Sequence, residues 1–222
     1  MAGTTIDLVA QDGHHFNAYK VLPEGKPKGA LVIGPEIFGV NSHIRAVADG
    51  YGADGYVAIA PALFDRVERN YQTGYEPDDI AAGRAVIGKL DWANTMKDVA
   101  ATIEHARPYG KIAVVGYCWG GTIAWLAAAR LSGLACTVAY YGGSIPAFIG
   151  EAPKCPIMLH FGEKDASLPV DKAREVASRH PAAKTLFYPA GHGFNCDQRG
   201  SYDAAASALA RSRTLEFLGK HL

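Results

Sequence analysis

The chain has 222 residues, of which 49% are hydrophobic and 20% are charged, and its formal net charge is zero. This composition fits a globular protein with a sizeable core, and neither the charge nor any apolar run points to nucleic acid or a membrane as partner. The four cysteines lack paired C-x-x-C spacing and the first residues lack the pattern of a signal peptide, so we expect reduced thiols in a cytoplasmic protein.

The first half of the sequence predicts an antiparallel hairpin followed by alternating strands and helices. Residues 4–9 and 15–22 have strand-like composition, and residues 11–13 between them read Gln-Asp-Gly, a turn signal. Residues 66–77 are polar without a clear period, which indicates a loop over the surface. The other elements expected here are strands at 29–33 and 56–60 and helices at 42–54, 78–87 and 91–107.

The second half continues the alternation of strand and helix. The expected strands are 112–115, 135–141, 157–162 and 185–188, and the expected helices are 122–129, 170–179 and 202–220. Residues 142–155 and 189–199 are predicted to be loops. Such alternation predicts an α/β fold, with a mostly parallel central sheet, helices on both faces and the antiparallel N-terminal edge. No linker or repeat divides the chain, so residues 1–222 are expected to form a single domain.

Residues 116–120 read Gly-Tyr-Cys-Trp-Gly, between a predicted buried strand and an alanine-rich helix. A strand that turns sharply into a helix needs glycines at these positions, and the residue at the apex is pushed out of the backbone. The pattern is the nucleophile elbow of α/β-hydrolases, with Cys118 in place of serine. A cysteine is more often a small buried hydrophobic residue. The flanking glycines, strand and helix favour the nucleophile here.

Two further loops follow predicted strands and carry titratable residues. Residues 163–165 read Glu-Lys-Asp, and His192 lies between two glycines. Cys118, Asp165 and His192 then occur in the nucleophile, acid, histidine order of α/β-hydrolases. A histidine can take the thiol proton, and an aspartate on the other ring nitrogen stabilises the imidazolium. Glu163 competes with Asp165 for the acid role, and either acid alone could be an ordinary turn residue.

An acyl-transfer site also needs donors for the oxyanion. The elbow supplies the backbone N–H of Trp119, and a second donor is expected in the loop 34–39, at Ile37. His160 lies within a predicted strand and is expected to be a hydrogen-bonded core residue. His192 and Cys196 have a spacing that metals sometimes use, but no second ligand pair accompanies them, so we expect no metal site.

Six motifs carry a resemblance to a known family: P-E-I-F-G-V-N at 35–41, A-P-A-L-F at 60–64, G-Y-C-W-G-G at 116–121, Y-Y-G at 140–142, G-E-K-D at 162–165 and G-H-G-F at 191–194. Over nearly its whole length the sequence resembles the dienelactone hydrolases, or carboxymethylenebutenolidases. The resemblance implies a catalytic triad of Cys118, Asp165 and His192. It also implies that Glu36 interacts with the resting thiol and is displaced by substrate, although Glu36 could equally be a solvated loop acid.

The chain departs from the family's pattern at the residues that bind the substrate carboxylate. The family's best-known members hold this group with two arginines, and Cys196 occupies the position of one of them. The candidates for the other are Arg66, Arg69 and Arg84, and none matches cleanly, while Arg199 could reach in from the same loop as Cys196. Since cysteine cannot replace a planar guanidinium, the resemblance leaves the anionic dienelactone substrate in doubt.

The sequence predicts a hydrolase that cleaves esters or lactones through a thioester on Cys118, without a cofactor. Phe38, Trp119, Tyr141 and Phe194 are expected to line an apolar pocket, and Arg84 is a candidate substrate contact. The expected partner is a small ester or lactone, bound by a monomer. Two alternatives stay open: a short-chain esterase or thioesterase, and a non-catalytic protein that senses oxidants through Cys118.

Overall fold

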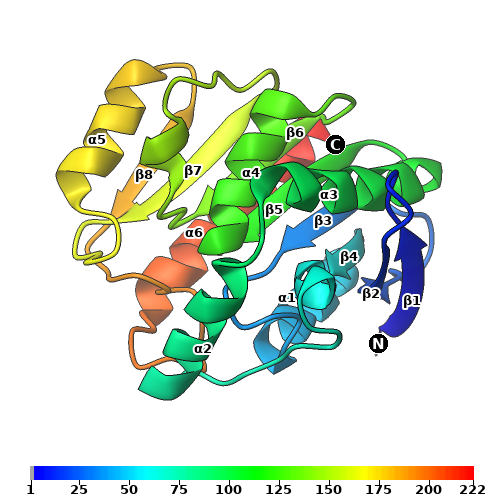
Figure 1. Cartoon of the computed structure of the whole chain (residues 1–222). Coiled ribbons are helices and arrows are strands. Elements are labelled where there is room, and N and C mark those ends of the chain that lie inside the picture. The colour runs from blue at the N-terminus through cyan, green and yellow to red at the C-terminus, as the bar shows by residue number, and fades with distance from the viewer. Residues whose placement is uncertain (1–2) are drawn as a thin grey trace. The chain divides into compact units, whose positions relative to one another are not determined.

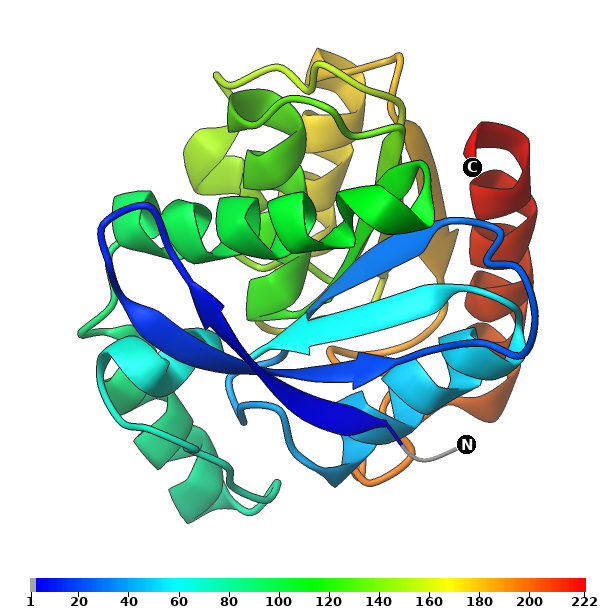
Figure 2. The same cartoon turned by 90° about the vertical axis from the view of Figure 1, so that its right-hand side faces the viewer.

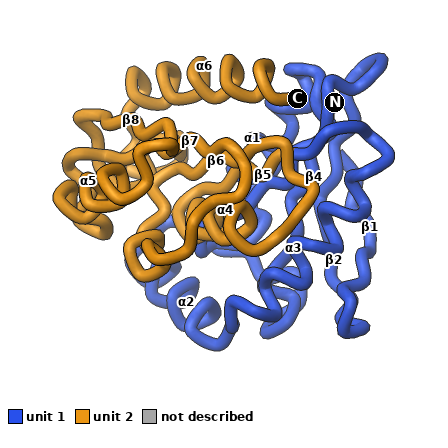
Figure 3. Tube along the Cα trace, turned by 90° about the horizontal axis from the view of Figure 1, so that it is seen from above, with its two compact units in different colours: residues 1–112 blue, residues 113–222 orange. Residues whose placement is uncertain are grey.

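A computed structural model describes residues 3–222, and these residues form two compact units. The first unit ends at Ile112 and the second runs from Ala113 to Leu222, coloured blue and orange in Figure 3. Strands with helices packed beside them make up both units (Figure 1). Among the helices of the described residues, none has the length and apolar composition needed to cross a membrane. The expectation of a single domain stays a prediction.

The strands of the first unit pair in the order β1-β2-β4-β3. β1 (Thr4–Val9) and β2 (His15–Val21) are antiparallel, as expected, and their turn places Gly13 at a φ of +80°. β2 also pairs antiparallel with β4 (Val57–Pro61), which is parallel to β3 (Ala30–Gly34). β3 and β4 are buried along their whole length, since continuous apolar runs suit strands that are covered on both faces.

Helices pack on the strands of the first unit on both faces (Figure 2). α1 contacts β2 and β4, and α3 contacts β3 and β4. Side chains cap the start of α1 and α3: for α3 the carboxylate of Asp91 accepts a hydrogen bond of 2.8 Å from the N–H of Asn94. The helices of this unit are α1 (Ser42–Ala53), α2 (Pro77–Ile87), α3 (Trp92–Ala106) and the short 3-10 helices η1 (Leu63–Arg66) and η2 (Arg107–Tyr109).

The second unit contains four parallel strands in the order β5-β6-β7-β8. β5 (Ile112–Tyr117) begins at the last residue of the first unit and is followed by β6 (Cys136–Tyr140), β7 (Ile157–Gly162) and β8 (Lys184–Tyr188). Every residue of β5, β6 and β7 is buried. Because all four strands run in the same direction, the loops after them meet at one edge, and Cys118, Asp165 and His192 lie in those loops.

Three helices cover the strands of the second unit. α6 lies on one side of them, and α4 and α5 lie on the other (Figure 3). α4 is buried throughout except for Arg130, which explains its composition of alanine, glycine and other apolar residues. The helices of this unit are α4 (Trp119–Arg130), α5 (Val170–Arg179), α6 (Ala204–His221) and the 3-10 helix η3 (Ile145–Phe148).

A buried chain of hydrogen bonds ties α6 to the ends of three strands. His160 is fully buried, with Nδ1 2.8 Å from the Tyr188 hydroxyl and Nε2 3.0 Å from Oγ1 of Thr214. Thr214 Oγ1 lies 2.7 Å from the Tyr140 hydroxyl, and Arg213 donates to the Tyr188 hydroxyl at 3.2 Å. Burial, with the positive charges of Arg213 and Lys184, lowers the pKa of His160 to about 3, so the ring is neutral. The expectation of a hydrogen-bonded core histidine is confirmed.

The structure differs from the sequence expectations mainly at element ends. α4 begins at Trp119, directly after Cys118, rather than at Thr122, because Cys118 alone makes the turn from strand to helix. The segment 142–155, expected as a loop, contains η3. Strand β5 extends two residues further than the apolar run that predicted it, through Gly116 to Tyr117. Propensity and periodicity do not resolve such boundaries, which hydrogen bonds in the tertiary structure determine.

Replacing Thr214 with valine should lower the free energy of unfolding by about 1–3 kcal/mol. The change keeps the shape of the side chain but leaves a buried ring nitrogen of His160 and the hydroxyl of Tyr140 without their partner. Urea unfolding of both proteins measures the difference. Thr4→Val, at an exposed position of β1, is the control and should change stability by less than about 0.5 kcal/mol. Equal stabilities for the two variants would show that the chain of hydrogen bonds contributes nothing.

Candidate active site

Cys118 occupies a strained one-residue turn between β5 and α4. Its backbone has φ +55° and ψ −115°, outside the regions that a non-glycine residue ordinarily adopts. Its N–H donates to the carbonyl of Tyr140 at 3.0 Å, which anchors the turn to the end of β6. A Cβ at Gly116 would overlap the carbonyl oxygen of Gly120, so only glycine permits the strand and helix to approach this closely. The elbow geometry expected from the sequence is present.

The side chains of Cys118, His192 and Asp165 form a continuous line of hydrogen bonds. His192 Nε2 lies 3.0 Å from the Cys118 sulfur, and His192 Nδ1 lies 2.7 Å from Oδ2 of Asp165. His192 keeps 14% of its side-chain surface exposed and Asp165 keeps 1%, so the acid is the most enclosed member. The structure therefore brings together the three residues that the sequence selected.

Asp165 is held rigidly by the loop that follows β7. Its Oδ1 accepts hydrogen bonds from the backbone N–H groups of Ser167, at 2.7 Å, and Leu168, at 3.0 Å. This arrangement commits one carboxylate oxygen to the loop and leaves the other for His192. Glu163, the alternative acid, has a side chain that is 43% exposed and lies 3.7 Å from Arg174. The geometry favours Asp165 over Glu163.

The pKa of His192 is raised from 6.5 to about 10. Burial of the ring opposes this shift, but the charge of Cys118 and the hydrogen bonds to Asp165 and Cys118 outweigh it. The raised pKa favours the protonated imidazole, which lies between the sulfur on one side and the carboxylate on the other. Each ring nitrogen of His192 thus has a partner, the sulfur at Nε2 and the carboxylate at Nδ1.

Aromatic rings enclose His192. Tyr141 has a φ of +37° and its ring meets the imidazole edge-on at 5.2 Å. Phe194 is fully buried and packs against Tyr141 at 5.3 Å and Tyr188 at 5.2 Å. Trp119 is 7% exposed and is the first residue of α4, where backbone N–H groups have no partner within the helix. The roles of Tyr141, Phe194 and Trp119 toward a substrate stay predictions.

The other residues selected from the sequence belong to the first unit. Glu36 is fully buried and Ile37 is 8% exposed, in the loop after β3. Phe38 is 1% exposed and packs edge-on against Tyr75 at 4.5 Å. Arg84 is exposed on α2. Glu36 is thus not a solvated loop acid, but its role toward the thiol, the oxyanion role of Ile37 and the substrate contacts of Phe38 and Arg84 stay predictions.

The arginines considered for a substrate carboxylate differ in their surroundings. Arg66 is occupied by Asp98, with two hydrogen bonds of 2.7 Å, and by Asp12 at 3.1 Å. Burial raises the pKa of Asp98, although Arg66 opposes this shift. Arg69 is half exposed and donates to the carbonyl of His15 at 3.2 Å. These contacts make Arg66 a structural residue of the first unit.

Arg199 lies beside the loop of His192. Its guanidinium carbon is 2.8 Å from the place that a Cβ would take at Gly193, which has a φ of +76°. Glycine at 193 therefore lets the guanidinium pack onto the backbone next to His192. Cys196, at the family's arginine position, is fully buried. The sequence alone suggested Arg199 only as a possible substitute for the family's arginine at position 196. It did not show that the Arg199 guanidinium packs on Gly193.

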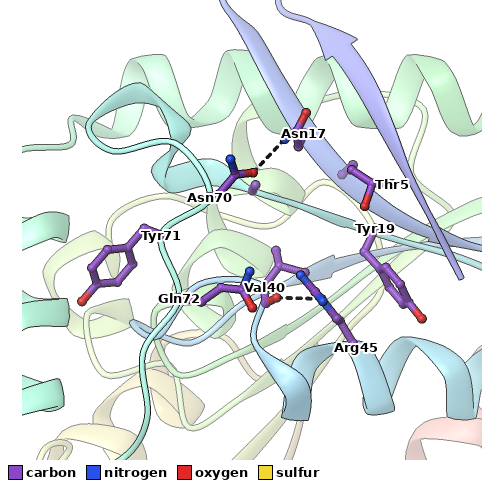
Figure 4. A pocket seen from close by; sticks show the side chains of 10 residues that line it. Thr5, Asn17, Tyr19, Val40, Arg45, Asn70, Tyr71 and Gln72 are labelled. Atoms are coloured by element: carbon purple, nitrogen blue, oxygen red, sulfur yellow. Dashed lines mark hydrogen bonds between the residues drawn. The ribbon is translucent and has the colours of Figure 1, made fainter.

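A pocket in the first unit does not suit an organic substrate. It lies beside β1 and β2 and has a volume of about 40 Å³ (Figure 4). Asn17 donates to Asn70 at 2.9 Å and Arg45 donates to the carbonyl of Val40 at 3.1 Å, both within its lining. A space of this size holds about one water molecule. Within each unit taken by itself, no three described His, Cys, Asp or Glu side chains converge as a metal would require.

Replacing Cys118 with alanine should lower the pKa of His192 from about 10 toward 6.5, because the first contribution that raises it is removed. Nitrogen-15 NMR of the imidazole at pH 8 should show a protonated ring in the wild type and a largely neutral ring in the variant. A folded-state pKa above the unfolded value stabilises the fold below pH 6.5, and this contribution disappears as the pH rises through about 10. His160, neutral in both proteins, is the internal control, and unchanged titration of His192 would exclude an ion pair with the sulfur.

Comparisons with known proteins find similarity along nearly the whole chain. The model of the Dienelactone hydrolase family matches residues 16–222. A carboxymethylenebutenolidase of Pseudomonas putida is 34% identical over 227 residues, covering 96% of this chain and 94% of that protein. A Synechocystis protein assigned as a carboxymethylenebutenolidase is 35% identical over 200 residues, covering 81% of each chain.

A solved structure extends the similarity to the fold. A protein of Klebsiella pneumoniae assigned to the dienelactone hydrolases superposes with a TM-score of 0.83 and 27% identity, covering 99% of this chain and 100% of that one. This similarity confirms the expected fold class, an α/β-hydrolase fold with a mostly parallel sheet and an antiparallel N-terminal edge. Motifs, geometry and relatives lead to one conclusion: the chain belongs to the dienelactone hydrolase family.

Proposed function

We propose that this protein hydrolyses carboxylic esters or lactones through a thioester on Cys118. The observation that carries the proposal is the placement of His192 between the Cys118 sulfur, at 3.0 Å, and Asp165, at 2.7 Å. The similarity to carboxymethylenebutenolidases supports the reaction class. No step of this chemistry calls for a cofactor.

In the proposed reaction, His192 takes the thiol proton of Cys118 and so produces the thiolate. The Cys118 thiolate attacks the substrate carbonyl, forming a carbon–sulfur bond and placing negative charge on the carbonyl oxygen. When the carbon–oxygen bond to the leaving group breaks, His192 Nε2 gives its proton to the leaving oxygen. Neutral His192 then takes a proton from water, whose oxygen attacks the thioester carbon. The carbon–sulfur bond breaks, and the carboxylic acid leaves with thiolate and imidazolium restored.

Asp165 and the first residue of α4 would stabilise the charges that develop during this reaction. The carboxylate, fixed by two backbone N–H groups, keeps a proton on Nδ1 of His192 and stabilises the imidazolium. Trp119, first in α4, would offer its N–H to the oxyanion, and the N-terminal end of the helix favours negative charge there. Ile37 is the second donor expected from the sequence.

A redox-sensing role for Cys118 is the alternative from another class. None of the four cysteines, all within the described residues, forms a disulfide, and Cys136 and Cys196 are fully buried. A sensor thiol usually has a second thiol nearby and has no use for a histidine held by an enclosed carboxylate. The arrangement around His192 therefore favours hydrolysis over sensing.

Cys118→Ala should abolish hydrolysis of a neutral aryl ester such as 4-nitrophenyl acetate, with a loss of more than about a thousandfold in kcat/KM. The backbone strain at this position is the same for alanine, so the circular dichroism spectrum should be kept. Cys155→Ala is the matched control and should retain full activity. Hydrolysis by the purified Cys118 variant at the wild-type rate would refute the mechanism.

The preference for an anionic substrate is expected to depend on Arg199. In Arg199→Gln, kcat/KM for an anionic dienelactone should fall about tenfold or more, the loss expected for a charge-assisted hydrogen bond, while the neutral aryl ester is unaffected. Arg174→Gln, on the exposed side of α5, is the control. An equal loss on both substrates would mean that Arg199 supports the His192 loop rather than the substrate.

The structure also bears on position 196, where the family's best-known members have an arginine. By the family resemblance, an arginine there would supply a clamp for anionic substrates. Because Cys196 is fully buried in this chain, an arginine would have to place its charge in the interior or displace its neighbours. Cys196→Arg is therefore expected to destabilise the fold rather than to improve the site.

A further inference from the structure

A second cavity lies in the other end of the second unit, away from the Cys118 loop. Its volume is about 510 Å³, within the range of sites for small organic ligands. Two chain segments form its walls: residues 152–157, which lead into β7, and residues 179–183, which lead from α5 into β8. The walls are mostly apolar, with prolines at 153, 156 and 181.

The cavity and the candidate active site lie at opposite ends of β7 and β8. It lies at the amino ends of β7 and β8, whereas Asp165 and His192 follow their carboxyl ends. Figure 1 shows the two strands side by side and pointing in the same direction. Strands of five and six residues span about 17–20 Å. A ligand in this cavity would therefore not contact the triad.

Backbone hydrogen bonds hold both walls in place. The N–H of Lys154 donates to the carbonyl of Ala128 at 2.8 Å, and the carbonyl of Pro156 accepts from Thr137 at 2.9 Å. On the opposite wall the N–H of Ala183 donates to the carbonyl of His180 at 2.9 Å. The prolines restrict the same segments further. The cavity is thus formed without a ligand, which reduces the entropic cost of binding.

The charged side chains of the lining are all basic. Lys154 and Arg179 are both exposed, and among the described residues neither the ammonium group of Lys154 nor the guanidinium of Arg179 has a hydrogen-bond or ion-pair partner. Other cations nearby are paired: Arg130 makes two hydrogen bonds to Glu151, at 2.6 and 2.7 Å. No Asp or Glu is among the lining residues. The cavity combines an apolar wall with two cations that lack an anion.

We propose that this cavity binds a small organic carboxylate, with Lys154 and Arg179 at its charged end. The apolar body of the ligand lies against the prolines and Ile157. A guanidinium and an ammonium group complement a carboxylate by charge-assisted hydrogen bonds, and a neutral molecule of the same shape lacks this contribution. The site is independent of Cys118 and is assigned whether or not the hydrolase proposal holds.

Cys155 provides a reporter inside the cavity. Its side chain is part of the lining and is half-buried, and burial raises the pKa of its thiol. Cys136 and Cys196 are fully buried and should react slowly. In a Cys118→Ser protein, iodoacetamide at pH 8.5 should therefore modify Cys155 first, and mass spectrometry identifies the modified residue.

The test measures the rate of Cys155 alkylation with benzoate or benzamide added at constant ionic strength. Saturating benzoate should slow alkylation at least fivefold, and benzamide at the same concentration should slow it by less than twofold. In Lys154→Gln/Arg179→Gln, half-maximal protection should need at least tenfold more benzoate. The control pair Lys172→Gln/Arg174→Gln, on exposed positions of the adjacent α5, should leave protection unchanged. Each variant is compared with its own rate without ligand.

Three results would overturn the proposal. Protection by neither probe would show that the cavity takes no ligand of this size. Equal protection by benzoate and benzamide would show that charge has no part in binding. Undiminished protection in the Lys154 and Arg179 double variant would show that other groups hold the anion. Because the assay uses a protein without the Cys118 thiol, none of these results bears on ester hydrolysis.

Discussion

The turn at Cys118 connects the architecture of the second unit to its chemistry. A chain that passes from β5 into α4 through a single residue must place that residue at a positive φ, and it must accept a near contact between Gly116 and Gly120. The strain is offset by burial of β5 and of nearly all of α4, and by the hydrogen bond from Cys118 to Tyr140. As a result, the side chain of Cys118 points out of the backbone at the edge where the loops of the parallel strands converge.

Two buried histidines in this unit show how surroundings decide ionisation. The ring nitrogens of His160 contact hydroxyl groups. Burial, together with the positive charges of Arg213 and Lys184, lowers the pKa of His160 to about 3. His192 is also mostly enclosed, but a sulfur and a carboxylate flank its two nitrogens, and its pKa rises to about 10. Desolvation acts against the charge in both cases, so the neighbours make the difference. Burial therefore keeps one ring neutral, and charged neighbours favour the protonated form of the other.

His160 and His192 are connected through Tyr141. The backbone carbonyl of His160 accepts from the N–H of Tyr141 at 2.8 Å, and the ring of Tyr141 contacts His192. Tyr140 joins the hydroxyl chain through its side chain and holds the Cys118 turn through its carbonyl. The hydrogen-bonded core therefore contacts both the Cys118 turn and the tyrosine that packs against His192.

The sequence by itself determined the alternation of strand and helix, the antiparallel edge and the positions of Cys118, Asp165 and His192, because glycine spacing, apolar runs and chain order are local signals. The tertiary structure decided which acid points at the histidine, since both Asp165 and Glu163 follow β7 and only packing separates an enclosed carboxylate from an exposed one. It also showed that Cys196 is buried, that Arg199 packs on Gly193 and that Lys154 and Arg179 share a cavity. These facts join residues from different elements, and no periodicity or motif records a distance between side chains that only folding brings together.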